Sequence, residues 1–295
     1  MVCFVILHYM TLEETSRCVN KLLKETEGEK QIVVVDNHSA DGSGRQLQEA
    51  FGAVSNVTVL LQEENSGFAR GNNVGYAYAV QQFDPDFVVV MNSDIELCQP
   101  DFIQRISGIY DREAYAVLGP DIYSTKIQGH QSPKSISGMT KEEVEKIHET
   151  YRKRCSSKVV VPIRCLLKQL GQLKSLVYKN RAQKSGVLHS QVYYNVPLHG
   201  SCFVFSRLFT QVRTQAFYPG TFFYFESEIL DYECRKAGLK TVYDPSVQVI
   251  HRQNVSTDKV YRSELKKVRF MNRCMYESTS AFLELMDQEE KGGQA

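Results

Sequence analysis

Short runs of β-branched and aliphatic residues alternate with segments of helical character along the first 120 residues, and this alternation constrains the fold more than any other feature of the sequence. The apolar runs are continuous, which is typical of strands buried on both faces of a parallel sheet. We therefore predict a βαβαβαβα unit and an α/β fold built on a doubly wound, mainly parallel sheet. The predicted strands cover residues 2–7, 31–35, 57–61 and 87–91, and the predicted helices cover 12–26, 41–51, 68–82 and 100–110.

The pattern breaks between about residues 124 and 195, inside a stretch from Thr150 to Phe225 that has no Asp or Glu but twelve Lys or Arg. Regular α/β character returns near Gly200, with strands predicted at 202–205 and 247–250 and a helix at 226–238. A helical tail is predicted from about residue 258, with a frayed polar end at 291–295. We interpret the chain as a catalytic domain over 1–256, with a variable basic insertion at about 125–195, followed by a helical extension over 257–295.

The composition is that of a globular chain. Of its 295 residues, 42% are hydrophobic and 23% are charged, which excludes global disorder, and the net charge of +1 gives no overall bias toward nucleic acid. The eight cysteines form no C-x-x-C pair, so we expect reduced thiols in a cytosol rather than a zinc site or a disulfide framework. The apolar start is too short for a signal sequence, and no window is long enough for a spanning helix, so we expect a protein that is soluble or at most rests on a membrane surface.

Polar clusters follow three of the predicted strands. In open α/β sheets, ligands bind outside the carboxyl ends of the strands, so three such clusters at one edge indicate a binding site. Each cluster taken alone is also explained by turns and helix caps, which favour Asn, Asp and Gly. The clusters are Asp36-Asn-His-Ser-Ala-Asp-Gly-Ser43, Asn65-Ser-Gly-Phe-Ala-Arg-Gly-Asn-Asn73 and Asn92-Ser-Asp94.

In their order and approximate spacing, the strings V-D-N-x-S-x-D-G-S, N-x-G-F-A-x-G-N-N and N-x-D resemble family 2 glycosyltransferases, especially the rhamnosyltransferase-like branch. The resemblance covers residues 2 to about 123 well and 198–256 moderately, but neither 125–195 nor the tail. It implies a GT-A fold and an enzyme that takes a sugar from a UDP- or dTDP-linked donor.

The same resemblance implies where the nucleotide-sugar is bound. It places His8 and Tyr9 beside the nucleobase of the donor, and it implies that Asp36 accepts hydrogen bonds from that nucleobase. A pyrimidine edge offers an N–H to such a carboxylate, glycine allows close backbone approach, and arginine meets diphosphate charge. An exposed arginine on a helix also needs no ligand to explain it. The remaining donor-site residues implied are Asn65, Gly67, Arg70, Asn92 and Ser93, with Gly200 and Ser201 facing the sugar and the acceptor.

A divalent metal is implied at the third cluster, because Asn92-Ser93-Asp94 occupies the D-x-D position of the family. Mg²⁺ or Mn²⁺ there neutralises the diphosphate as the glycosidic bond breaks. The first Asp of the motif is Asn92 in this sequence, so Asp94 becomes the main predicted ligand. His251 stands where related enzymes carry a His that reaches the metal or the diphosphate, although a lone His at a strand end is more often structural.

The acidic cluster Glu226-Ser-Glu228-Ile-Leu-Asp231 follows an aromatic run and opens the predicted helix at 226–238. In the family, the catalytic base lies in an acidic motif at this place, and inverting transfer needs a carboxylate to remove the proton of the acceptor hydroxyl. Here the motif is E-S-E rather than E-D. We rank Glu228 first, then Glu226, then Asp231, while acids at a helix start are also favoured by the helix dipole alone.

Apolar residues recur at helical spacing from Ile163 to Val177, with Arg164, Lys168 and Lys179 on the opposite side. This pattern predicts a helix that lies on an anionic membrane surface, or else an ordinary amphipathic helix packed on the catalytic domain. No nucleic-acid-binding module is recognisable. The resemblance implies a glycan or lipid-linked acceptor, polysaccharide synthesis, and a cytoplasmic enzyme held peripherally at the inner face of the membrane.

Two other functions fit a nucleotide site on such a sheet. A nucleotidyltransferase usually has a glycine-rich basic loop after the first strand, whereas this chain has His8-Tyr-Met-Thr11 there. A catalytically inactive glycan-binding module need not keep Asp94 together with Glu226 and Glu228. A dinucleotide oxidoreductase is disfavoured because no G-x-G-x-x-G follows the first strand. The sequence therefore favours an inverting, metal-dependent glycosyltransferase.

Overall fold

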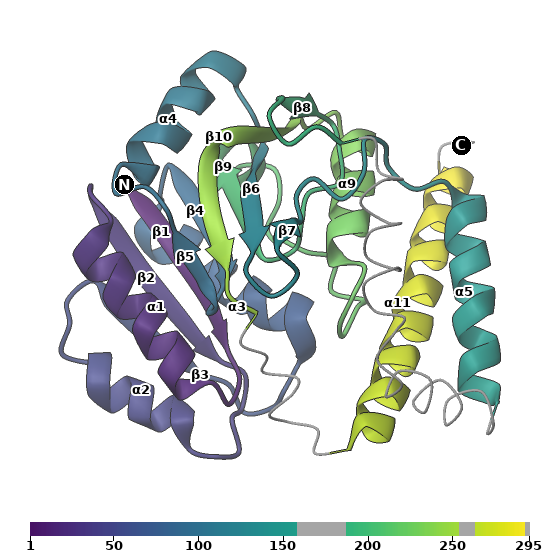
Figure 1. Ribbon diagram of the computed structural model, residues 1–295, viewed down its shortest axis with the longest axis horizontal. Coiled ribbons are helices and arrows are strands. Elements are labelled where there is room, and N and C mark those ends of the chain that lie inside the picture. The colour runs from purple at the N-terminus through teal and green to yellow at the C-terminus, as the bar shows by residue number, and fades with distance from the viewer. Residues whose placement is uncertain (158–186, 254–262, 293–295) are drawn as a thin grey trace.

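The computed structural model describes residues 1–157, 187–253 and 263–292, and it contains one large mixed sheet with helices on both faces (Figure 1). The strand order is β3-β2-β1-β4-β9-β6-β10-β5. The first four strands run parallel, β9 is antiparallel to both of its neighbours, and β6 and β10 are parallel to each other. The predicted α/β class is confirmed, because the sheet is centred on the parallel strands β1 (Val2–His8), β2 (Lys30–Asp36), β3 (Val57–Leu61) and β4 (Phe87–Asn92).

Side chains of β1 alternate between two hydrophobic cores, because successive residues of a strand point to opposite faces of the sheet. Phe4 and Ile6 join one core with the apolar faces of α1, α2 and α4, while Cys3 and Val5 join the other with α3, α8 and α9. The predicted double winding therefore follows from strands that are apolar on both faces. These helices are α1 (Leu12–Glu25), α2 (Ser43–Phe51), α3 (Gly67–Phe83), α4 (Phe102–Glu113), α8 (Arg207–Thr210) and α9 (Glu226–Lys236).

Several elements after residue 94 were not predicted, because turn residues interrupt their apolar patterns. Gly119-Pro120 lies inside β6, and Asp244-Pro245-Ser246 lies inside β10, where the pairing register shifts. The sequence therefore predicted only the last part of β10. The strands in this half of the sheet are β5 (Ile95–Leu97), β6 (Val117–Ser124), β7 (Gly129–His130), β8 (Tyr193–Tyr194), β9 (Cys202–Ser206) and β10 (Thr241–His251).

Two long helices, α5 (Lys141–Ser156) and α11 (Glu264–Gly292), lie side by side beyond α9, on the right in Figure 1. A third apolar cluster joins them to α9 through Val144 of α5, Ile229 of α9 and Phe282 of α11. Helix α5 was not predicted, although Thr140 and Glu143 form a capping box at its start. The predicted helical tail is confirmed within the described range.

The predicted amphipathic helix at 163–177, with Arg164, Lys168 and Lys179, lies outside the described residues. Within the ranges that the structure describes, no helix combines the length and the apolar character that crossing a membrane requires.

Candidate active site

The carboxyl ends of β1, β2 and β4 lie side by side, because His8 pairs with Asp36 and Leu7 pairs with Asn92 in the sheet register. The polar residues that the sequence singled out after these strands therefore share one edge of the sheet. Tyr9 is half-buried at the same edge.

His8 is fully buried, and its Nε2 lies 3.9 Å from Asp36 Oδ1. Its Nδ1 is 2.8 Å from Thr15 Oγ1, its Nε2 is 2.8 Å from Ser43 Oγ, and burial lowers its pKa below the usual value. The Asp36 carboxylate accepts the backbone N–H of Ser39 at 3.2 Å. A neutral His8 thus supports the Asp36 loop from inside the protein. Asp36, rather than His8, is the group that can meet a ligand at the edge of the sheet.

An asparagine network holds the second loop. Asn37 Nδ2 donates to Asn65 Oδ1 at 3.0 Å, and Asn37 Oδ1 accepts the backbone N–H of Ser66. Gly67 has a φ of +83°, and a side chain there would collide with Phe222. The backbone N–H of Phe68 donates to Phe222 O at 2.7 Å, which ties this loop to the aromatic run before α9. The sequence named Asn65 and Gly67 but missed the role of Asn37.

Arg70 lies on the exposed side of α3, where its Nε donates to Pro219 O at 2.9 Å. This bond fixes the direction of the side chain and leaves the terminal nitrogens of the guanidinium at the surface. Arg70 is therefore anchored next to the Gly67 loop and presents positive charge there.

Asp94 and His251 come together across the sheet, with His251 Nε2 3.3 Å from Asp94 Oδ1. The other ring nitrogen, Nδ1, is 2.7 Å from Gln131 Oε1, and Arg252 N donates to Asp94 O. The Gln131 contact fixes the orientation of the ring, so that Nε2 faces the Asp94 carboxylate. A carboxylate oxygen and a ring nitrogen at this distance can be bridged by one divalent cation. The residues therefore fit the metal that the sequence predicted, with one oxygen and one nitrogen ligand.

The loop before β9 closes this side of the site. Asn92 N donates to Ser201 O at 2.9 Å, which joins Asn92-Ser93-Asp94 to Gly200-Ser201. Ser201 Oγ lies 2.9 Å from His199 Nδ1, and the His199 ring is 5.9 Å from that of His251 between centroids. Burial, together with the nearby charges of Lys134 and His251, holds the pKa of His199 well below its usual value. His199 is therefore a neutral ring beside the predicted metal ligands.

The three candidate bases differ in their surroundings. Glu226 is buried and accepts a hydrogen bond from Thr221 Oγ1 at 3.2 Å. Burial raises the pKa of Glu226 to about 7. Asp231 is buried and paired with Arg235 Nε at 3.0 Å, although burial still raises its pKa. Glu228 keeps 18% of its side chain exposed and pairs with Lys134 Nζ at 2.8 Å. Burial acts to raise the pKa of Glu228, but the charge and hydrogen bond of Lys134 hold it below the usual value. Glu228 is thus both ionised and partly accessible.

The backbone before α9 is strained in a way that orients these acids. Tyr224 and Phe225 both have positive φ, at 76° and 71°, and each such non-glycine residue costs about 1–3 kcal/mol. Ser278 of α11 donates its hydroxyl to Phe223 O at 3.0 Å, and Phe225 packs against Phe282 of α11. Helix α11 therefore braces the turn that begins α9.

A four-residue segment that sequence reasoning missed connects the two halves of the site. Gln131 contacts His251, Ser132 Oγ accepts the backbone N–H of His199 at 3.4 Å, and Lys134 contacts Glu228. Residues three positions apart are separated by at most about 11 Å at their Cα atoms, so one short segment contacts both His251 of the predicted metal site and the candidate base Glu228. The segment falls in the predicted basic insertion, where no repeated pattern or motif marks single residues.

This sheet order, with polar loops at the carboxyl edge of its parallel strands, is that of a GT-A glycosyltransferase. The chain belongs to glycosyl transferase family 2, because the sequence model of that family matches residues 3–169. The resemblance that the loop strings indicated is thereby confirmed.

Two curated relatives are similar to this chain in sequence. The low-salt glycan biosynthesis hexosyltransferase Agl10 of Haloferax volcanii is 24% identical over 287 residues, which cover 96% of this chain and 77% of that protein. The glycosyltransferase GlyG of Streptococcus pneumoniae is 28% identical over 121 residues, which cover 40% of this chain and 38% of GlyG.

Solved structures share the fold at low identity. TarS 1–349 of S. aureus in complex with UDP matches with a TM-score of 0.51 and 15% identity, over 92% of this chain and 64% of that one. GalNAc-T7 with UDP, GalNAc and Mn²⁺ matches with a TM-score of 0.55 and 14% identity, over 90% of this chain and 49% of that one. This chain thus spans less than two thirds of either structure, and the likeness supports the fold alone.

Proposed function

We propose that this glycosyltransferase is an inverting, metal-dependent enzyme that moves a sugar from a UDP- or dTDP-linked donor to an acceptor hydroxyl. The observation that carries the proposal is the segment 131–134, which contacts His251 through Gln131 and Glu228 through Lys134. The residues proposed to hold the metal, Asp94 and His251, and the carboxylate proposed to act on the acceptor, Glu228, are therefore connected through one short segment.

The donor lies along the carboxyl edge in this proposal. Asp36 accepts hydrogen bonds from the base, the loop at Asn65 and Gly67 approaches the ribose and the diphosphate, and Arg70 meets phosphate charge. Asp94 and His251 would hold Mg²⁺ or Mn²⁺, which supplies charge neutralisation for the leaving diphosphate. The Mn²⁺ and UDP in the GalNAc-T7 structure and the UDP in the TarS complex support this class of donor.

Glu228 is the proposed base. A base must be ionised before it can take the proton of the acceptor hydroxyl, and it must be accessible to that hydroxyl. The ammonium of Lys134 provides the first condition, and the partial exposure of Glu228 provides the second. Glu226 and Asp231 fail the second condition, so they support the turn and helix α9 in this account.

The acceptor is proposed to be a glycan or a lipid-linked sugar in cell-surface polysaccharide synthesis. Support comes from the name of Agl10, a hexosyltransferase of glycan biosynthesis. The basic stretch that includes Arg164, Lys168 and Lys179 would hold the enzyme at an anionic membrane surface on the cytoplasmic side.

Release of nucleoside diphosphate from a panel of UDP- and dTDP-sugars, with Mn²⁺ and candidate acceptors, tests the proposal. Glu228→Gln should lower transfer about 10²–10⁴-fold, the typical effect of losing a general base, while donor affinity stays unchanged. Glu49→Gln, a carboxylate on the exposed face of α2, is the matched control and should transfer normally. If Glu228→Gln turns over like Glu49→Gln, Glu228 is not the base.

A further inference from the structure

A buried carboxylate, Glu96 of β5, lies two residues after Asp94 and faces three cations. Arg252 Nε is 2.5 Å from Glu96 Oε1, and Arg252 Nη2 donates to Glu96 Oε2 at 2.8 Å. The other two cations belong to α1: Arg17 Nε is 3.5 Å from Oε1, and Lys21 Nζ is 3.4 Å from Oε2. A carboxylate that is surrounded in this way is not available as a metal ligand, so its role in the site must be indirect.

The two proposed metal ligands come from different elements. Asp94 lies in the turn between β4 and β5, and His251 is the last residue of β10. Strands β5 and β10 meet along a ladder of three antiparallel residue pairs. One more hydrogen bond extends the ladder, because Arg252 N donates to Asp94 O at 3.0 Å. The distance between the Asp94 carboxylate and the His251 ring therefore depends on how firmly β5 is held against β10.

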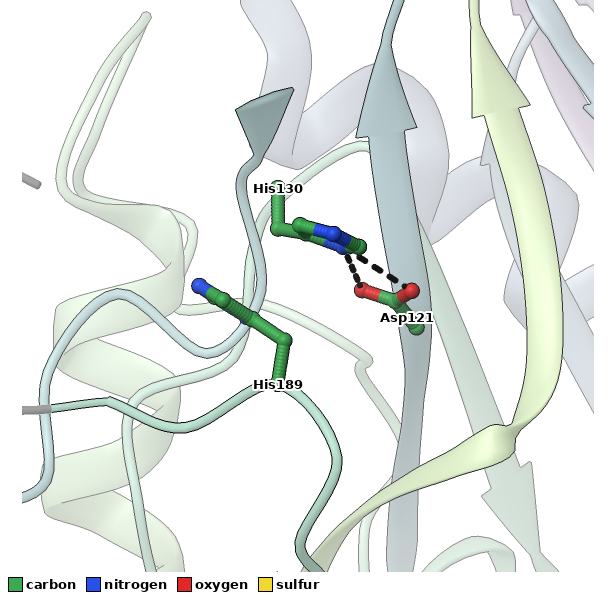
Figure 2. Close-up of side chains that lie close together, drawn as sticks. All are labelled: Asp121, His130 and His189. Carbon is green, nitrogen blue, oxygen red and sulfur yellow. Dashed lines mark hydrogen bonds and ion pairs between the residues drawn. The ribbon is translucent and has the colours of Figure 1, made fainter. Parts of the chain in front are cut away.

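The position of His251 does not require β5. Strand β10 also pairs with β6, up to and including His251, and Gln131 contacts the His251 ring at Nδ1. Gln131 follows His130, whose Nδ1 contacts both carboxylate oxygens of Asp121 and whose ring stacks on His189 (Figure 2). The support behind His251 is thus fixed from the β6 side of the sheet.

The strand that follows Asp94 has much less support of its own. Strand β5 has three residues and stands at the edge of the sheet. Backbone hydrogen bonds of a short edge strand open locally at little cost. The ion pairs of Glu96 fasten this strand on two sides, to the end of β10 through Arg252 and to α1 through Arg17 and Lys21. The contact with Arg252 has two prongs, and such a contact fixes orientation as well as distance.

We propose that Glu96 is a positioning residue for the metal site. By fastening β5 to Arg252 and to α1, it sets the distance between the Asp94 carboxylate and the His251 ring that a divalent cation would bridge. The inference rests on the proposed function, because it takes Asp94 and His251 as the metal ligands. Residues that support metal ligands from outside change metal affinity about 10- to 100-fold, and we expect the low end because Glu96 acts through the strand.

Position and charge give opposite expectations for one partner of this ion pair. Replacing Glu96 with glutamine removes negative charge near the site, which by electrostatics alone weakens the binding of a cation. Replacing Arg252 with glutamine removes positive charge, which by electrostatics alone strengthens it. If the ion pair acts by holding β5 in place, both replacements weaken the binding of the cation.

The test is Mn²⁺ titration of the full chain, followed by the electron paramagnetic resonance signal of the free ion, with UDP and with dTDP. Glu96→Gln and Arg252→Gln should each weaken Mn²⁺ binding about 10-fold, and Arg252→Lys, which keeps a charged donor, should weaken it less. Glu25→Gln is the matched control. It removes a carboxylate that also pairs with Lys21, at 3.3 Å, but belongs to α1, so it should bind Mn²⁺ like the wild type.

Hydrogen exchange of the metal-free proteins gives a second readout, since Glu96→Gln should speed exchange of the β5 amides and Glu25→Gln should not. If Glu96→Gln does not fold, the Arg252 variants decide the matter, because that side chain is 45% exposed. Unchanged Mn²⁺ binding in Glu96→Gln, or tighter binding in Arg252→Gln, would overturn the inference and leave the proposed function intact. Absence of Mn²⁺ binding in the wild type would overturn the proposed metal site and this inference with it.

Discussion

Replacing Gly44 with alanine should displace Asp36 without changing any group that contacts a ligand. Gly44 lies in the first turn of α2, where an added Cβ would overlap the carboxylate of Asp36 and come within 2.9 Å of its Cβ. Carbon atoms in contact are normally separated by about 3.5–4.0 Å, so Asp36 must move. The movement breaks the hydrogen bond that Asp36 accepts from Ser39 N and takes the carboxylate away from the proposed binding site of the nucleobase.

The size of the effect follows from the bonds involved. A hydrogen bond to a charged group contributes about 1.5–3 kcal/mol, so the affinity for UDP or dTDP should fall about 10- to 100-fold. Overpacking costs about 1–3 kcal/mol of folding stability, and replacing glycine by alanine within a helix returns up to about 1 kcal/mol. Gly44→Ala should therefore remain folded while losing its nucleotide.

Isothermal titration calorimetry with UDP and Mn²⁺ measures this loss. Gly108→Ala is the matched control, because Gly108 is also in a helix and an added Cβ there meets only Arg112 Nη1, at 3.7 Å. It should bind nucleotide like the wild type and be equally or more stable. If Gly44→Ala and Asp36→Asn both bind the nucleotide with wild-type affinity, the assignment of Asp36 to the nucleotide site is refuted.

Three further predictions concern stability and location. Because burial raises the pKa of Glu226 to about 7, the folded state binds a proton more tightly than the unfolded state, so this residue costs stability as pH rises from 5 to 8. Urea denaturation should show that Glu226→Gln gains about 1–3 kcal/mol over the wild type across this range, and a pH-independent difference would contradict the raised pKa. Phe282→Ala should cost about 3–5 kcal/mol in the same assay, because it opens a cavity where α11 meets α5 and α9, and a loss below about 1 kcal/mol would show that α11 is not anchored there. Replacing Arg164, Lys168 and Lys179 with Glu should weaken sedimentation with anionic liposomes at low salt, and equal sedimentation with neutral vesicles would exclude electrostatic attachment.

The parallel half of the sheet could be predicted because each strand there is a continuous apolar run, and continuous runs such as Val2–Leu7 are specified locally. The predicted strand 57–61 agrees with β3 at both ends. The polar loops also had short motifs with a fixed order, which indicated the edge at which Asp36 and Asp94 lie. Local chemistry was sufficient for these features.

The other half depends on contacts that no local pattern records. Pro120 and Pro245 interrupt β6 and β10, which hold their places through pairing with each other. Lys134 reaches Glu228 only because the segment 131–134 contacts both the loop before β9 and α9, and one lysine in a basic stretch has no distinguishing signal.

Calorimetric titration with UDP and dTDP tests most directly whether the carboxyl edge of the sheet holds a metal-dependent nucleotide site. With Mn²⁺ present, the wild type should bind at least one of the two nucleotides, and a chelator should abolish the binding. Asp94→Asn should lower the affinity at least 10-fold, because it removes the charged ligand opposite His251. Failure of both nucleotides to bind in the presence of Mn²⁺, or unchanged affinity in Asp94→Asn, would contradict the account.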